Sequence, residues 1–193
     1  MSAIVIDVTV LVHDLALDHI QQVVYDDRYA ALATGVTMPP ARVSIAADGP
    51  QAEVFRTRGY ACGMVGKWHL GTADSLLPSA QGFTYERVIA KNGLDYYNYT
   101  ITRGNRTVFE DHGESYLTDK LTDYGVEFIR HNRDKPFFLY LAYSAPHVLL
   151  VPRGDKLRKY FFRYEKFGGK YNPNYAAMVE SLDDGVGRIL ETL

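Results

Sequence analysis

The sequence predicts an α/β fold in which a mostly parallel β-sheet is flanked by helices. Short apolar runs alternate with segments whose apolar residues recur at three- and four-residue steps, and this alternation is typical of strand–helix–strand units. Residues 137–143 are apolar without interruption, as in a strand that is covered on both faces. The sequence contains no internal repeat and no low-complexity segment, so we interpret residues 1–193 as one domain.

The first part of the chain predicts two strands and two short helices. Residues 4–12 are rich in β-branched side chains and too few for a good helix, which favours a buried strand. Pro39 and Pro40 suit the start of a helix over residues 41–47. Residues 51–58 are a second predicted helix, closed by Gly59, and residues 60–65 are the next strand.

The second part predicts two longer helices on either side of the strand at 137–143. Residues 78–105 are rich in Tyr and Gly, and we expect them to be irregular. A helix capped by Ser115 follows, and a second helix covers residues 175–193, because the apolar residues of both segments repeat at helical spacing. Residues 153–171 interleave basic and aromatic side chains, which suits either a polyanion-binding segment or a solvated loop that packs its rings on the domain.

Composition excludes several classes of protein. Hydrophobic residues make up 47% of the chain, enough for a sizeable core, and no apolar run approaches the ~20 residues that span a bilayer. The 21 Lys and Arg residues nearly balance the 23 Asp and Glu residues, so we expect no nucleic-acid partner, and the lack of a long apolar run leads us to expect no membrane partner. Cys62 is the only cysteine, which excludes an internal disulfide and a cysteine-based zinc cluster.

Polar side chains follow three of the predicted strands. His13 and Asp14 follow the first, Lys67 and His69 follow the second, and His147 follows the strand at 137–143. The carboxyl ends of parallel strands meet at one edge of a sheet, where ligands bind in open α/β folds. These groups therefore converge if the sheet is parallel, although a single histidine after a strand is often only a surface or structural residue.

The segment around Trp68 suits an anion site. Lys67 and His69 are two residues apart, so in extended backbone both side chains point the same way while Trp68 points to the other side and anchors the loop. Two cationic groups on one side stabilise negative charge in a transition state. Arg42 lies at a predicted helix start, where unpaired N–H groups also favour an anion. A solvated turn and a surface arginine are the alternatives.

At this point the sequence resembles the type I sulfatases. Residues 59–71, Gly-Tyr-Ala-Cys-Gly-Met-Val-Gly-Lys-Trp-His-Leu-Gly, follow that family's G-Y-x-T-x-x-x-G-K-W-H-L-G segment. Residues 82–85, 116–119, 135–147 and 175–187 agree with further family segments. The resemblance covers residues 51–193 clearly, whereas residues 1–50 are degenerate, so the chain is similar to a single incomplete sulfatase-like catalytic domain.

The resemblance implies a fold like that of alkaline phosphatase and the hydrolysis of sulfate esters, including sulfated glycans. The family's nucleophile is a formylglycine made from Cys or Ser in a C/S-x-P-S/A-R motif, and a divalent cation, usually calcium, holds the sulfate. By this likeness, Lys67 and His69 would contact the formylglycine and the sulfate. His147 would face the sulfate or the leaving group, and Arg42 would support the nucleophile.

The same likeness shows departures at the nucleophile and at the metal site. Met38 occupies the formylglycine position, and a thioether cannot become formylglycine. Cys62 does not replace it, because its place inside a predicted strand indicates a buried structural thiol. Asp14 keeps one possible metal ligand, whereas His13 stands where the family has a second aspartate, so we expect calcium to bind weakly or not at all.

Together these features predict a sulfuric ester hydrolase by resemblance, with impaired catalysis. The family's remaining metal ligands, in an S-D-N-G segment, would follow the helix that ends near Leu193, and the spacing between Arg42 and Lys67 is shorter than the family's. The alternatives are a pseudoenzyme that binds sulfate or sulfated glycans, and a fragment of a longer active sulfatase. Sulfatases are commonly exported, but residues 1–7 show no signal peptide, so the compartment and the oligomeric state stay open.

Overall fold

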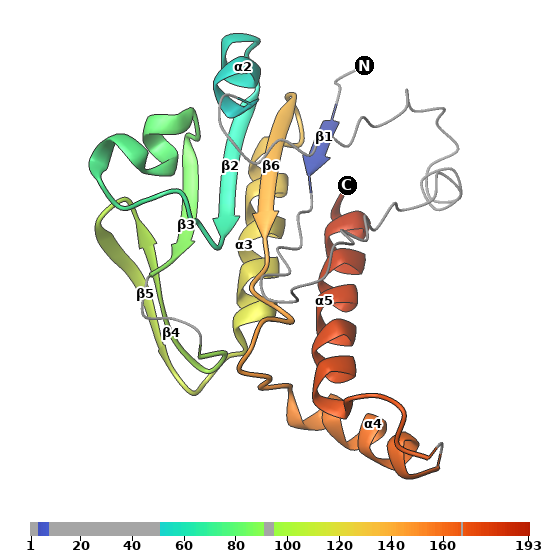
Figure 1. The fold of residues 1–193 in the computed structure, drawn as a ribbon. Helices are drawn as coiled ribbons and strands as arrows, with labels where there is room; N and C mark the ends of the chain where they lie inside the picture. The colour runs from blue at the N-terminus through green and yellow to red at the C-terminus, as the bar shows by residue number, and fades with distance from the viewer. Residues whose placement is uncertain (1–3, 8–50, 91–94, 167) are drawn as a thin grey trace, which may run out of the picture.

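The computed structural model describes residues 4–7, 51–90, 95–166 and 168–193, which form a six-stranded sheet with the order β1-β6-β2-β3-β4-β5 (Figure 1). Strands β1 (Ile4–Asp7), β6 (Phe137–Ala142), β2 (Ala61–Gly66) and β3 (Tyr85–Ile89) run parallel to one another. Strands β4 (Asn98–Arg103) and β5 (Arg106–His112) continue the sheet antiparallel. The prediction of a mostly parallel sheet flanked by helices is confirmed.

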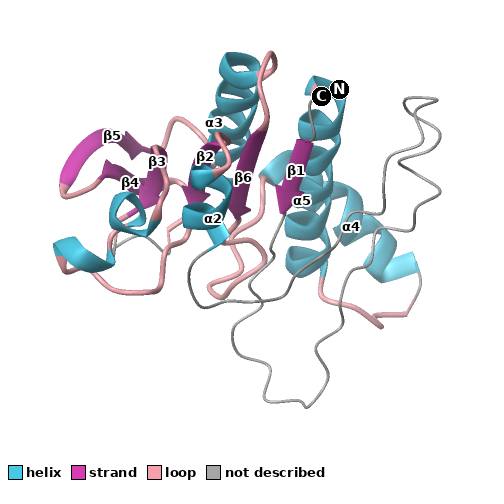
Figure 2. Cartoon of the chain, turned by 90° about the horizontal axis from the view of Figure 1, so that it is seen from above, coloured by secondary structure: helices cyan, strands magenta, loops and turns pink. Residues whose placement is uncertain are grey.

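Helices cover both faces of the parallel half of the sheet. Helix α2 (Gln51–Thr57) lies on one face, and helices α3 (Leu117–Asn132) and α5 (Pro173–Thr192) lie on the other (Figure 2). Side chains of β6 alternate between them. Phe138 packs in the cluster under α2, while Leu139 and Leu141 belong to the larger cluster under α3 and α5. This two-sided burial explains why β6 has no charged residue and carries a single hydroxyl, that of Tyr140.

Close approach between α3 and α5 depends on small residues. A Cβ atom on Gly125 would lie 2.8 Å from Cδ1 of Ile189, and one on Gly185 would lie 2.6 Å from Oγ1 of Thr122. The Tyr143 hydroxyl, just beyond β6, bonds the Thr122 hydroxyl at 2.8 Å within this contact. The two helices and the end of β6 therefore pack as one unit.

The segment expected to be irregular is partly regular. Residues 78–105 contain the short 3-10 helix η2 (Pro78–Gln81) and strands β3 and β4, so that expectation is wrong for much of its length. The two-residue turn Gly104-Asn105 joins β4 to β5, and Tyr99 and Ile101 are buried at alternate positions of β4. Alternation around a Gly-Asn pair is a hairpin signal that the abundance of Tyr and Gly obscured.

The cap expected for α3 is also different. The N-cap is Tyr116, whose side chain makes no capping bond. Ser115 instead donates through its hydroxyl to the buried Asp111 carboxylate at 2.5 Å. Burial opposes the charge of that carboxylate, but hydrogen bonds from Ser115, Gly113 and Glu114 outweigh it and lower the pKa of Asp111. Asp111 thus holds the turn between β5 and α3.

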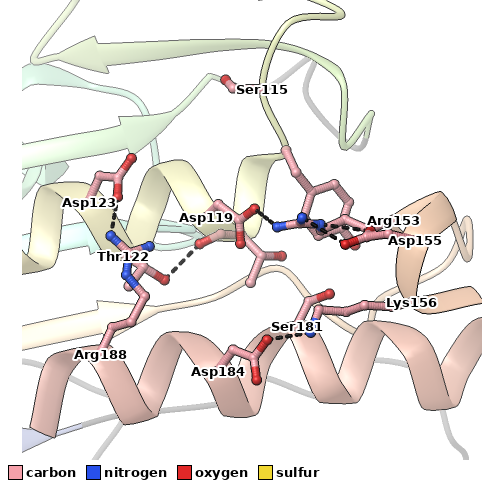
Figure 3. Close-up of polar contacts among 12 residues, drawn as sticks. Ser115, Asp119, Thr122, Asp123, Arg153, Asp155, Lys156, Ser181, Asp184 and Arg188 are labelled. Atoms are coloured by element: carbon pink, nitrogen blue, oxygen red, sulfur yellow. Dashed lines mark hydrogen bonds and ion pairs between the residues drawn. The ribbon is translucent and has the colours of Figure 1, made fainter. Parts of the chain in front are cut away.

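Most of the segment 153–171 is a helix rather than a solvated loop, since residues 154–166 are helical. Helix α4 (Gly154–Lys166) lies at the end of the molecule toward which the arrowheads of β2 and β6 point (Figure 1). Its first turn is fastened by ion pairs, since Arg153 contacts Asp119 of α3 at 2.5 Å and Lys156 contacts Asp184 of α5 (Figure 3). No helix within the described ranges has the length and apolar character needed to cross a membrane.

Candidate functional site

The carboxyl ends of β2 and β6 lie side by side. The backbone N–H of Lys67 donates to the carbonyl oxygen of Ala142 at 2.8 Å, which continues the parallel ladder one residue past the end of β2. Gly66 permits this approach, because its φ is +114° and a Cβ atom there would lie 1.9 Å from the Ala142 oxygen. We call residues 67–69 and 144–147, which follow these two strands, the carboxyl edge.

Trp68 anchors the first half of the carboxyl edge. Its indole Nε1 donates to the carbonyl oxygen of Leu76 at 2.9 Å, and its ring meets Phe83 edge-on with 5.9 Å between ring centroids. The expected role of Trp68 as a packing anchor is confirmed. Lys67 on one side of it is half-buried, and His69 on the other is exposed. Both residues therefore flank a ring that is held in place.

Two buried tyrosines hold the second half of the carboxyl edge and the residues just after it. The Tyr96 hydroxyl donates to the carbonyl oxygen of His147 at 3.2 Å, and the Tyr116 hydroxyl donates to that of Val151 at 3.0 Å. Burial raises the pKa of both phenols, so they remain neutral donors. His147 itself is half-buried, and its Nδ1 contacts the carbonyl oxygen of Val148. The Tyr96 bond to His147 has no signal in the sequence, and it was not predicted.

Ser144 adds a buried hydroxyl next to His147. Only 3% of Ser144 is exposed, and its Oγ has no hydrogen-bond partner among the described atoms. Buried hydroxyls almost always have a partner, because an unpaired one costs about 1–3 kcal/mol. An unsatisfied donor thus stands at the end of β6, in the segment that carries His147. Sequence reasoning did not single out this residue.

Cys62 is a structural thiol, as predicted. It is fully buried within β2, and its Sγ donates to the carbonyl oxygen of Ala52 in α2 at 3.4 Å. Burial raises the pKa of Cys62 to about 11, although Arg56 opposes the shift. A thiol that stays protonated at neutral pH is a poor nucleophile.

Several expected site residues lie outside the described residues. Arg42, Met38, Asp14 and His13 all fall in the range 8–50, as does the predicted helix at 41–47. Of the expected site residues, Lys67, His69 and His147 lie within the described ranges. The strands that precede Lys67 and His147 end side by side.

The described residues do not form a calcium site. Among them there is no group of three or more His, Cys, Asp or Glu side chains placed to hold a metal ion. Calcium takes six to eight oxygen ligands, usually with several carboxylates. We therefore assign no chemical step to a metal at the carboxyl edge.

Chemically, the carboxyl edge can bind an anion. Lys67 brings an ammonium group, and the imidazole rings of His69 and His147 can donate hydrogen bonds. Backbone hydrogen bonds and the Tyr96 contact position these residues on rigid elements. Such groups stabilise negative charge without reorganising.

Comparisons with known proteins point to one family. The model of the Sulfatase family matches residues 50–193. The uncharacterized sulfatase YdeN of Escherichia coli K12 is 34% identical over 167 residues, and arylsulfatase J of Mus musculus is 30% identical over 145 residues. The crystal structure of Ps i-CgsB in complex with k-i-k-neocarrahexaose is 26% identical with a TM-score of 0.57.

These matches cover most of this chain but a minor part of each relative. The matches to YdeN and arylsulfatase J include 73% and 68% of this chain, and 29% and 23% of those two proteins. The match to Ps i-CgsB covers 74% of this chain and 35% of that one. The family model, however, matches well over half of the residues here. The chain belongs to the sulfatase family.

Proposed function

We propose that the carboxyl edge binds the sulfate group of a sulfate ester through Lys67, His69 and His147. The observation that carries this proposal is the Lys67–Ala142 hydrogen bond of 2.8 Å, since it places the segments bearing Lys67 and His147 on adjacent strand ends. Family membership supports sulfate as the anion. The neocarrahexaose in the Ps i-CgsB complex supports a glycan as the molecule that bears the sulfate group.

The cations supply binding and charge neutralisation. A sulfate ester carries one negative charge shared by three oxygens, and negative charge builds on the ester oxygen as the S–O bond breaks. Lys67 would neutralise the charge on the sulfate oxygens, and the histidines would donate hydrogen bonds to the sulfate or to the leaving oxygen. The Ser144 hydroxyl stands near His147 in the chain as a further donor.

We further propose that turnover by this chain is impaired. The position that matches the family's formylglycine is Met38, whose thioether supplies no hydrated aldehyde to attack sulfur. We also expect weak calcium binding or none, because His13 replaces a carboxylate beside Asp14. We therefore propose a protein related to the sulfuric ester hydrolases that binds a sulfate ester but hydrolyses it inefficiently.

A turnover assay tests the impairment. The 193-residue chain is incubated with 4-nitrophenyl sulfate with and without calcium chloride, and release of 4-nitrophenol is followed. We expect a rate no different from that of the His69→Ala variant and no effect of calcium. A robust rate that disappears in His69→Ala would contradict the proposal and require another nucleophile.

Two alternatives keep the same anion site. In the first, the chain is a pseudoenzyme whose role is to bind sulfate or sulfated glycans. Its affinity should fall with added salt and with Lys67→Ala, but not with Lys135→Ala at the amino end of β6.

In the second alternative, the chain is part of a longer active sulfatase, which its 29% coverage of YdeN favours. Sequencing the flanking DNA tests this, because a downstream S-D-N-G segment would support it.

A further inference from the structure

A cavity with largely aromatic walls lies between α4 and the start of α5. It has a volume of about 320 Å³ and is lined by Tyr160, Arg163, Tyr171, Asn172, Tyr175 and Ala176. We call it the tyrosine pocket. Its volume is at the lower end of the range for small-molecule sites, and aromatic walls with few polar groups are typical of such sites. Figure 1 places α4 and the start of α5 at the end of the molecule toward which β2 and β6 point.

Contacts among the tyrosines hold the walls of the tyrosine pocket. The Tyr171 ring lies edge-on to the Tyr160 ring at 6.4 Å between centroids and to the Tyr164 ring at 5.9 Å. The Tyr171 hydroxyl donates to the carbonyl oxygen of Tyr160 at 2.8 Å. Asn172 caps α5 by accepting from the backbone N–H of Asn174 at 2.9 Å. The pocket is thus built from packed side chains at a helix junction.

Arg163 is the basic residue in the lining of the tyrosine pocket. Arg153, Lys156 and Lys159 are each paired with carboxylates of α3, α4 or α5. Arg163 is exposed, lines the tyrosine pocket and has no ion pair with another described side chain. Its guanidinium is available for an anionic ligand, and its planar set of donors suits a sulfate or carboxylate.

We propose that the tyrosine pocket binds one sulfated sugar unit of a glycan, with Arg163 on the sulfate and Tyr175 against the ring. Sugar rings present apolar C–H faces that pack on aromatic rings, while their hydroxyls bond to phenol and amide groups. This inference rests on the proposed function, since a glycan held at the carboxyl edge gives the pocket its ligand. The pocket would then add affinity for the glycan away from the sulfate group held by Lys67.

Calorimetric titration with a heparin-derived tetrasaccharide and its desulfated counterpart tests the proposal. We expect the native chain to prefer the sulfated form. Arg163→Gln and Tyr175→Ala should each weaken its binding about tenfold. Because Tyr175 is 43% exposed, we expect its replacement to leave the fold intact. Arg158→Gln and Phe162→Ala are the controls, because both residues are exposed on α4 and outside the pocket lining, and they should stay within about twofold.

Three outcomes would overturn the proposal. They are no binding of the tetrasaccharide, equal loss in the Arg158→Gln control, and tighter binding of a ten-residue thymidine oligonucleotide that Tyr175→Ala abolishes. Titration with inorganic sulfate separates this proposal from the previous one. If Lys67→Ala weakens sulfate binding while Arg163→Gln leaves tetrasaccharide binding unchanged, the carboxyl edge stands and the tyrosine pocket fails. If instead Arg163→Gln weakens tetrasaccharide binding while Lys67→Ala leaves sulfate binding unchanged, the tyrosine pocket is supported and the carboxyl edge is rejected.

Discussion

At the scale of single residues, Gly66 controls the geometry of the carboxyl edge. It is the last residue of β2, and only a residue without a Cβ atom fits between Lys67 and the Ala142 carbonyl. Its φ of +114° is also a conformation that other residues adopt only with strain. The Lys67 backbone bond to β6 depends on both properties.

Replacing Gly66 should therefore be costly. We expect Gly66→Ala to lower the free energy of unfolding by about 2–4 kcal/mol, because strain and a backbone clash act together. Gly59→Ala is the matched control, since Gly59 also has a positive φ of +81° but nothing lies within 4 Å of a Cβ atom there. It should cost only about 1–2 kcal/mol. Urea unfolding of both variants checks this, and equal losses would refute the role of the close approach.

At the scale of elements, α4 is held by charge rather than by a deep apolar face. Lys156 is 12% exposed and contacts Glu180 and Asp184 of α5, and Lys159 contacts Glu180 at 2.9 Å. Partly buried pairs with several partners contribute more to stability than isolated surface pairs. The position of α4, and with it the tyrosine pocket, depends on this network.

Removing the central cation should loosen α4. We expect Lys156→Met to reduce stability by about 1–2 kcal/mol, because it removes the ion pair of Asp184 and leaves Glu180 with Lys159 alone, while the length of the side chain is kept. Arg158→Met, at an exposed position of the same helix, should change stability by less than about 0.5 kcal/mol. Denaturant unfolding measures both. A Lys156→Met chain as stable as the native one would show that these pairs contribute nothing.

Glu180 should make this docking depend on pH. Hydrogen bonds from Lys159, together with those from Tyr160 and Lys156, outweigh burial and lower the pKa of Glu180 from 4.5 to about 2. A folded-state pKa below the unfolded value gives stability that is complete above about pH 4.5 and is lost as the pH falls toward 2. The Tm difference between native and Glu180→Gln chains should therefore narrow below pH 4.5. A constant difference from pH 6 to pH 3 would contradict this assignment.

The elements that could be predicted from the sequence bury more apolar surface than those that could not. Strand β6 and helices α3 and α5 bury wide apolar faces, which leave a clear period in the sequence. Strand β5 is exposed along most of its length, so its composition resembles a loop. In α4, Leu157, Tyr160 and Tyr164 are half-buried at helical spacing, but seven basic residues over 153–170 obscured that pattern. A helix or strand that is only partly buried therefore shows a weak apolar period in its sequence.

At the scale of the whole molecule, the parallel order of β6 and β2 creates the carboxyl edge. Motifs far apart in the sequence, at 66–69 and 144–147, become neighbours because their strands pair in register from Ala61 with Phe137 to Gly66 with Ala142. Sequence reasoning could predict this meeting from two apolar runs with polar endings. It could not predict the supporting contacts of Tyr96 and Tyr116, since these join residues 51 and 35 positions apart.

Calorimetric titration of 4-nitrophenyl sulfate into the native and Lys67→Ala chains tests the central claim, that the carboxyl edge holds a sulfate ester without efficient hydrolysis. Binding gives heat that saturates, whereas hydrolysis gives heat that continues after each injection. We expect saturable binding by the native chain, at least tenfold weaker binding by Lys67→Ala, and no continuing heat. Equal affinity in both chains, or a continuing heat from the native chain, would contradict the account.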